Sequence, residues 1–269
     1  MSNDGEWKSA ITYYEPNKLV VRGYRLDELI GRLSFADGVF LILRGRLPSP
    51  AESDLMNAML LAEIDHGLLA PSAQAARIAI SGARESVQGA VAAGVLTLGN
   101  IHGGAIEDAA EVFQEGVARA RAEERTLAET ARRIVHEHQE AGRRIPGFGH
   151  PIHTDDPRTK RLFQLAEQHR FGADHVALAR EMEQAIPEIL GKALPINVDG
   201  AVAAIISDMG FDWRLGRGLF IIGRVPGLVA HVYEELTEER PMRTARLVTR
   251  YVGPPEQPLP AELGERGGK

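Results

Sequence analysis

The chain has 269 residues, of which 44% are apolar, so it is long enough to bury one large core or two smaller ones and is not a disordered protein. Its formal net charge of -6 comes from 31 basic and 37 acidic residues spread along the sequence, which gives no surface of one sign for a nucleic-acid backbone. There is no cysteine, so disulfides, thiolate metal sites and thiol nucleophiles are excluded.

The N-terminal stretch MSNDGEWKSAITYY has no basic region followed by an apolar one. We therefore expect no secretory signal and a cytoplasmic protein. The longest apolar run covers residues 219–232, with interruptions by Gly, Arg, Pro and His. It is shorter than the roughly 20 residues that cross a bilayer, so we expect a buried helix and no membrane partner.

Residues 11–24 mix β-branched and aromatic side chains around Pro16-Asn17, which predicts a short hairpin. The sequence after it is typical of helices. Ser49 and Glu52 form a capping box around Pro50 and predict a helix start there. A second capping box, Thr126 to Glu129, predicts a helix that ends near residue 142.

Further helices are predicted from Asp156-Pro157, over residues 173–189, and from 202 to 209 after the sequence NVDG. The tail from Pro254 is rich in Pro, Gly and Glu, so we expect a mobile end or an arm that lies on a neighbouring molecule. No linker is long enough to divide the chain into independent domains.

Four stretches interrupt the helical pattern with Gly, Pro and acid–base groups: DHG at 65–67, GNIHGGA at 99–105, PGFGH at 146–150 and PINVDG at 195–200. Glycines beside a histidine allow close approach to a ligand, and the N-terminus of a following helix offers free N–H groups. Taken alone, each stretch is explained as well or better by helix capping.

Two arginines suggest an anionic ligand. Arg224 lies within the apolar sequence FIIGRVPGLVAHV, where a buried charge needs either a structural carboxylate or a substrate carboxylate as its partner. Arg158 follows Asp156-Pro157 at a predicted helix start, where a cation opposes the helix dipole. An anionic ligand would relieve that conflict.

Taken in order, DHG, HGGA, GFGH, DPR, NVD, the GR of IIGRVPG and the ERP of EERPMR resemble the citrate synthase superfamily. The similarity extends upstream to RLSFADGVFLILRGRLPSPAE and covers about residues 20 to 245. Seven short motifs in one order are far more specific than any one of them. The NVDG form, the short DHG, the TLGNIHGGAIEDAAEVF context and the short chain are most similar to citryl-CoA lyases, including the lyase module of ATP-citrate lyase.

The resemblance implies an all-α fold with a short N-terminal β or extended segment. It also implies a discontinuous large helical domain, residues 1–105 and 211–269, and a smaller mobile helical domain, residues 106–210. No tightly bound cofactor is implied, because a coenzyme A thioester is a substrate in this family. The other implied partners are oxaloacetate or citryl-CoA.

The resemblance implies three catalytic residues. Asp199 would remove a proton from the methyl group of an acetyl thioester, or return it in cleavage, and His102 would stabilise the enol oxygen. His150 would exchange a proton with the carbonyl of oxaloacetate or the hydroxyl of citryl-CoA. His102 keeps a synthase-like pattern that the ATP-citrate lyase module lacks, so condensation stays open.

The resemblance also implies a binding set. His66, Arg158 and Arg224 would hold the dicarboxylate, since guanidinium groups pair bidentately with carboxylates. Arg240 would come from the other subunit of a homodimer or higher oligomer. Coenzyme A would contact Pro146, Gly147, Phe148 and Gly149, with Arg143, Arg144 or Lys192 near its phosphates. Arg143 and Arg144 taken singly are more typical of solvated surface.

The chain departs from the family between His150 and Arg158, where the spacing is one residue shorter than usual and His153 is extra.

Three other functions stay open. One is citrate or 2-methylcitrate synthesis, and another is a family member without turnover. The third is a metal-dependent hydrolase, with ligands from His136 and His138, or from His150, His153, Asp155 and Asp156. Neither histidine pair has a recognised ligand spacing, so we expect no metal site.

Overall fold

The computed structural model describes residues 7–149, 156–243 and 250–260. The chain opens with the predicted hairpin, in which β1 (Thr12–Glu15) and β2 (Lys18–Val21) are antiparallel, and β3 (Tyr24–Arg25) extends the sheet. Glu15 is paired with Lys18, so Pro16-Asn17 form the turn. Asn17 has a φ of 60°, a conformation that asparagine tolerates better than most residues.

Helices make up most of the remaining described residues, so the expected all-α class is confirmed. The first ones are α1 (Leu26–Leu29), α2 (Phe35–Arg44) and α3 (Pro50–Ala62). The predicted capping box at the start of α3 is present, with Ser49 and Glu52 each accepting a hydrogen bond from the other's backbone N–H. Next come α4 (Pro71–Gly82), α5 (Val87–Leu96) and α6 (Ala105–Ala122).

The second half holds α7 (Leu127–Glu140), α8 (Pro157–Gln168) and α9 (Asp174–Leu190), followed by α10 (Val198–Asp208), the short 3₁₀ helix η1 (Trp213–Leu215) and α11 (Gly216–Glu238). The predicted starts of α7 and α8 are confirmed. One boundary was wrong: α10 begins at Val198, inside NVDG and not after it, because the Asn197 side chain caps the helix by accepting from Gly200 N–H.

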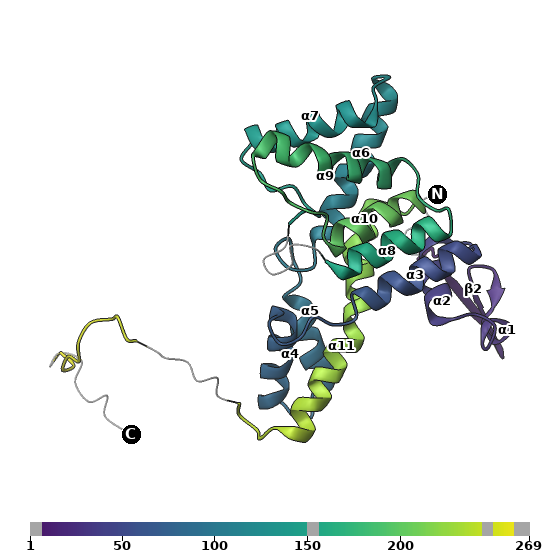
Figure 1. Ribbon diagram of the computed structural model, residues 1–269. Coiled ribbons are helices and arrows are strands. Elements are labelled where there is room, and N and C mark those ends of the chain that lie inside the picture. The colour runs from purple at the N-terminus through teal and green to yellow at the C-terminus, as the bar shows by residue number, and fades with distance from the viewer. Residues whose placement is uncertain (1–6, 150–155, 244–249, 261–269) are drawn as a thin grey trace, which may run out of the picture.

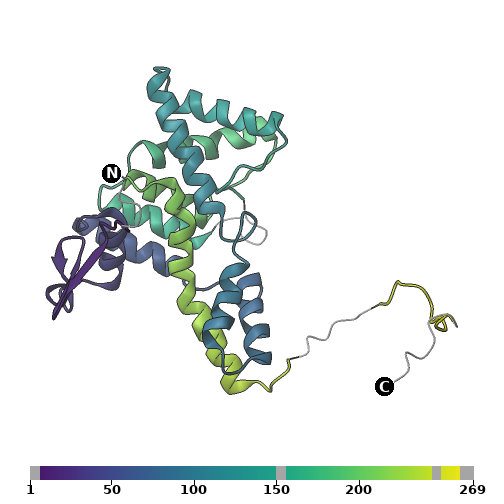
Figure 2. The same cartoon turned by 180° about the vertical axis from the view of Figure 1, so that it is seen from behind.

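The helices form three groups along the molecule (Figure 1). At one end α6, α7 and α9 pack together, in the middle α8 lies between α3 and α10, and at the other end α4 and α5 pack against the lower half of α11. The reverse view shows α11 running from the middle group to the far end (Figure 2). Because α11 contacts α3, α4, α5 and α6, it connects these groups.

Helix α11 with η1 covers 26 residues, and its most apolar window has a mean hydropathy of 1.2. The expectation that this stretch is too short to cross a membrane was therefore wrong on length. A central helix of a soluble protein meets the same criteria. Arg224 and Glu235 are both buried on this helix and form ion pairs within the protein, as expected for a helix packed against protein.

The buried apolar residues form two clusters. The larger one joins α2 and α3 to α6 through α10 and to the start of α11, and the smaller one joins α4, α5 and the second half of α11. The larger cluster contains residues of both predicted domains, the large one (1–105 and 211–269) and the small one (106–210). That division stays a prediction.

Candidate active site

A cavity of about 680 Å³ lies where α3, α4, α6, α8, α10 and α11 meet. It collects most of the residues that the sequence predicted for the site, namely His66, His102, Arg143, Arg144, Pro146, Gly147, Phe148, Gly149, Arg158, Asp199 and Arg224. Lys192 and Arg240 are not in its lining, and both are exposed. His150 lies outside the described residues.

His102 lies in a tight turn that precedes α6. The backbones of Gly99 and His102 exchange two hydrogen bonds, of 2.7 and 3.1 Å, which closes this turn. The His102 ring places Nε2 3.0 Å from Oγ of Ser72, in the first turn of α4, and meets the edge of the Phe220 ring. Ser72 is fully buried. These contacts fix the orientation of the imidazole at the cavity wall.

The pKa of His102 is lowered by burial and by the positive charges of Arg224 and His66. A neutral imidazole at pH 7 is a hydrogen-bond donor at one nitrogen and an acceptor at the other. If Ser72 donates to Nε2, the His102 proton lies on Nδ1. The ring can then donate that proton to an oxygen that gains negative charge, as an enolate oxygen does.

Asp199 lies in the first turn of α10, and two hydrogen bonds from Asn197 to the PGFG loop decide where that turn lies. Gly147 O accepts a hydrogen bond of 3.0 Å from Asn197 N, and Asn197 Nδ2 donates to Gly149 O at 2.8 Å. A Cβ on Gly200 would lie 2.3 Å from Gly147 O. The two backbones can come this close because both Gly147 and Gly200 lack a side chain. The PGFG loop and the start of the NVDG helix therefore pack as one unit.

The carboxyl group of Asp199 has its pKa raised to about 6, chiefly by burial, with Arg158 and Arg224 opposing the rise. Burial disfavours the charged carboxylate, whereas the two guanidinium groups favour it. A carboxyl group in this balance changes its protonation near neutral pH. It can therefore take a proton from a carbon acid or return one.

Arg158 has a structural partner, Asp156, where the sequence pattern had suggested an anionic ligand. The side chain of Asp156 caps α8 by accepting from Arg158 N at 3.0 Å and receives two more bonds from the guanidinium, at 3.1 and 2.8 Å. Asp156 thus offsets the cation at the helix start without any ligand. Arg158 also lines the cavity, and its Nη1 donates to Ala62 O at 3.4 Å.

Arg224 is only 3% exposed, and it enters the cavity because α11 passes very close to the end of α3. A Cβ on Gly223 would lie 2.9 Å from Cβ of Glu63, and one on Gly227 would lie 2.3 Å from Ile64 O. Arg224 Nε donates to Glu63 O at 2.9 Å, and its guanidinium stacks 4.7 Å from the Phe220 ring centre.

Glu63 and Ser72 are two residues of the site that the sequence did not predict. Glu63 ends α3, lines the cavity and is 3% exposed. Burial and the charge of Asp199 raise its pKa to about 8, against the opposing effect of Arg158 and Arg224. A glutamate three residues before His66, at the end of an apolar helix, was the available signal for Glu63. Ser72 had no comparable signal, because serine is common in the first turn of helices.

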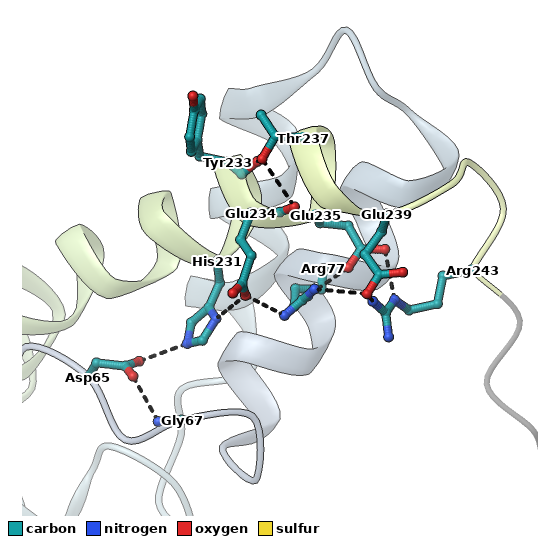
Figure 3. Close-up of polar contacts among 10 residues, drawn as sticks. All are labelled: Asp65, Gly67, Arg77, His231, Tyr233, Glu234, Glu235, Thr237, Glu239 and Arg243. Carbon is teal, nitrogen blue, oxygen red and sulfur yellow. Dashed lines mark hydrogen bonds and ion pairs between the residues drawn. The ribbon is translucent and has the colours of Figure 1, made fainter.

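The DHG turn that carries His66 is held by an ionic network on α4 and α11 (Figure 3). Asp65 accepts from Gly67 N at 2.9 Å and contacts His231 Nε2 at 3.0 Å. From His231 the network continues along the helices, through Glu234, Arg77, Glu235 and Glu239, to Arg243. The turn at the cavity is therefore connected to the segment that contains Arg240.

The residues predicted for coenzyme A differ in burial. Gly147 and Phe148 are buried, whereas Arg143 and Arg144 are exposed at the rim of the cavity. His138 Nδ1 lies 3.0 Å from Arg144 O, which ties the end of α7 to this loop. Within the described ranges no group of three or more His, Asp or Glu side chains is arranged to hold a metal ion. Of the residues considered as ligands, His150, His153 and Asp155 lie outside them.

Comparison with known proteins finds a family model, a curated relative and solved structures that match this chain. The model of the family "Citrate synthase, C-terminal domain" matches residues 48–245. Citrate synthase 2 of Bacillus subtilis is 30% identical over 225 residues, which cover 82% of this chain and 57% of that protein. The chain thus spans little more than half the length of this curated relative.

Among solved structures, citryl-CoA lyase from Hydrogenobacter thermophilus is 49% identical, with a TM-score of 0.87 over 96% of this chain and 98% of that one. ATP citrate lyase from Methanothrix soehngenii, in complex with citrate and coenzyme A, is 25% identical with a TM-score of 0.78, over 95% of this chain and 43% of that one. The match of the family model over most of the sequence shows that this chain belongs to the citrate synthase family.

Proposed function

We propose that the protein is a citryl-CoA lyase that cleaves citryl-CoA to acetyl-CoA and oxaloacetate. The observation that carries this proposal is the 49% identity to a citryl-CoA lyase along almost the whole of both chains. The match to a citrate synthase is 30% identical and covers 57% of that protein. The cavity supports the assignment, because it places a carboxyl group, a neutral imidazole and two guanidinium groups around one space.

Cleavage of citryl-CoA breaks the bond between the carbon that bears the hydroxyl group and the methylene carbon of the thioester. The hydroxyl proton leaves, its oxygen becomes the ketone of oxaloacetate, and the electron pair of the broken bond forms the enolate of acetyl-CoA. We assign removal of the hydroxyl proton to His150, by the family resemblance. His102 would donate a hydrogen bond to the enolate oxygen, an interaction typically worth about 3 kcal/mol.

Protonation of the enolate carbon completes the reaction, and we assign this step to Asp199. Its raised pKa keeps a substantial fraction of the carboxyl protonated near pH 6, so that it can donate to carbon. In the reverse direction the ionised carboxylate would remove a methyl proton from acetyl-CoA. In the cleavage direction His150 gains the hydroxyl proton and Asp199 loses one, so proton exchange with solvent would return both groups to their starting states before the next cycle.

The carboxylates of the substrate would bind at Arg224, Arg158 and His66. Arg224 supports this role, because its Nη1 is buried without a hydrogen-bond partner among the described residues. We propose that Arg240 completes the site from the second subunit of a homodimer, since it is exposed and lies outside the cavity of its own chain. Coenzyme A would lie along Pro146 to Gly149. A cytoplasmic location stays a prediction.

Citrate synthesis is the second candidate. His102 keeps the histidine of the synthase-like pattern and is held by Ser72, so the chemistry of condensation is available at this site. Synthase and lyase share the carbon–carbon step. They differ in whether water then hydrolyses the thioester and releases free coenzyme A.

One experiment separates the two activities. The purified protein is supplied with citryl-CoA in one assay and with acetyl-CoA plus oxaloacetate in another, while free thiol and oxaloacetate are followed. A lyase forms oxaloacetate from citryl-CoA without releasing thiol. Thiol release in the condensation mixture identifies a synthase instead, and no conversion in either assay rejects both activities.

A further inference from the structure

Glu63 and Arg224 form an unusual pair at the base of the cavity. Both are 3–4% exposed in their side chains, yet the shortest distance between their charged groups, Arg224 Nη2 to Glu63 Oε2, is 3.8 Å. Glu63 Oε1 and Arg224 Nη1 are buried and have no hydrogen-bond partner among the described residues. At 3.8 Å the two groups do not form a hydrogen bond.

Such an arrangement is costly unless it serves a ligand. Two charges removed from water recover their desolvation cost only when close hydrogen bonds satisfy them. The backbone holds this pair apart, because Arg224 Nε is already bound to Glu63 O at 2.9 Å and α11 is fixed against the end of α3 by Gly223 and Gly227. The open Nη1 of Arg224 is therefore left for a third group.

The charged groups around this pair decide whether Glu63 is protonated or ionised when an anionic ligand binds at Arg224. The charges come from Arg158 and Asp156 at α8, Asp199 on α10, Arg224 on α11 and Asp65 in the DHG turn, with His66 and His102 beside them. With Glu63 ionised, four carboxylates face two guanidinium groups. A bound dicarboxylate adds two more negative charges to this set.

We infer that Glu63 takes up a proton when a substrate carboxylate binds at Arg224, so that dicarboxylate binding is coupled to proton uptake at this residue. This inference rests on the proposed function, since it assumes that the dicarboxylate meets Arg224. Glu63 acts here as a positioning residue. When Glu63 is protonated, it no longer forms an ion pair with Arg224. The guanidinium of Arg224 can then pair with the carboxylate of the substrate alone.

The affinity for the dicarboxylate depends on pH in a direction set by the protonation of Glu63 in the free protein and in the complex. In the free protein the pKa of Glu63 is about 8. A bound anion raises that pKa further, because it favours the neutral form of a nearby carboxyl group. Well below pH 8 Glu63 is protonated in both states, and no proton is taken up. Above pH 8 the free protein is ionised while the complex is not, so the affinity falls as pH rises.

The test is calorimetric titration of the full-length protein with oxaloacetate at pH 8.5, in two buffers of different ionisation enthalpy. The difference between the two heats gives the number of protons taken up. We expect wild-type protein to take up at least about half a proton, and its affinity to fall by up to about tenfold per pH unit above pH 8. Binding without proton uptake overturns the inference and leaves the proposed function intact. No binding, together with no turnover of citryl-CoA, overturns both.

Variants locate the proton. Glu63→Gln keeps the shape of the neutral acid, and we expect it to bind oxaloacetate with no proton uptake and an affinity independent of pH between 7 and 9. The control is Asp54→Asn, which replaces an exposed acidic residue on α3, the helix that Glu63 ends. It should bind oxaloacetate with the same proton uptake as the wild type. Uptake that persists in Glu63→Gln and disappears in Asp199→Asn assigns the proton to Asp199 and overturns the inference. The wild-type measurement stands even if Glu63→Gln does not fold.

Discussion

The Nε2 atom of His102 lies 3.0 Å from Oγ of the fully buried Ser72, so a hydroxyl group at the start of α4 orients the imidazole in the loop before α6. Because two elements separated by 30 residues meet here, the ring orientation depends on how α4 packs. A hydroxyl can donate to a ring nitrogen or accept from it, so this contact fixes the orientation of the ring, and the proton lies on Nδ1 when the hydroxyl donates to Nε2. This contact gives the first of five predictions.

Ser72→Ala should lower kcat about fivefold, since one orienting hydrogen bond is worth about 1 kcal/mol. KM for the acyl thioester should change little, because the hydroxyl contacts the imidazole and not the substrate. The control is Ser207→Ala, which removes another buried serine hydroxyl from α10, away from the cavity lining. Ser207→Ala should reduce thermal stability without reducing kcat. Equal kinetics in wild type and Ser72→Ala would show that the contact has no catalytic role.

Asp199→Asn should abolish exchange of the acetyl-CoA methyl protons with deuterated solvent, with a loss of about 10²–10⁴-fold expected for a positioned acid–base group. The fold should persist and gain stability above pH 6, because the wild-type carboxyl is ionised in a buried position at that pH. Proton NMR of acetyl-CoA follows the exchange, and thermal unfolding follows the stability. Exchange at the wild-type rate would exclude Asp199 as the base.

The exchange rate in wild-type protein should rise with pH through about 6 and then level off. Removal of a methyl proton requires the ionised carboxylate, which predominates above its pKa of about 6 and is lost below it. The cleavage step, which needs protonated Asp199, should depend on pH in the opposite sense. Single-turnover rates measured from pH 5 to 8 test both senses, and rates that do not change across this range would show that burial does not raise this pKa.

Gly200→Ala should destabilise the protein by about 1–3 kcal/mol and weaken coenzyme A binding, because a Cβ there lies 2.3 Å from Gly147 O and would push the PGFG loop away from α10. Gly218→Ala is the matched control. That glycine lies in α11 with no atom within 4 Å of an added Cβ, so the change should be neutral or stabilise by up to about 1 kcal/mol. Denaturant unfolding of the two variants tests the difference. Equal stabilities would mean that the loop moves at no cost.

Arg240→Ala should raise the KM for the dicarboxylate or citryl-CoA while the protein stays dimeric, whereas Arg32→Ala, which removes another exposed arginine, should not. If Arg240 acts across the interface, mixing the Arg240→Ala chain, which binds substrate weakly, with the inactive Asp199→Asn chain should restore activity at substrate concentrations well below the raised KM. A mixed dimer then has one intact site, so about a quarter of all sites recover after random exchange. Absence of recovery, with subunit exchange verified by light scattering and a tagged subunit, would place Arg240 outside the neighbouring site.

Which helices form follows from local sequence to a large extent. The capping boxes at Ser49 and Thr126 and the Asp156-Pro157 start each fix a helix beginning through contacts within four residues, so the sequence predicted them correctly. Helix α6 was not predicted, although its buried residues Ile106, Ala109, Ala110, Phe113 and Val117 recur at helical spacing. The length of α11 was underestimated, because a helix packed on several sides does not end where an apolar run ends.

The motifs by themselves determined the family and the identity of most cavity residues, since a fixed order of short motifs implies a shared fold. Only the tertiary structure decided the partners that lie far apart in the sequence. It placed Ser72 against His102 and brought Glu63 within 3.8 Å of Arg224 across 161 residues of sequence, whereas Arg158 pairs locally with its own capping Asp156. The physical reason is that pairings and pKa shifts depend on burial and on distances between separate helices, which close packing at glycines such as Gly200 and Gly223 sets and which no local pattern encodes.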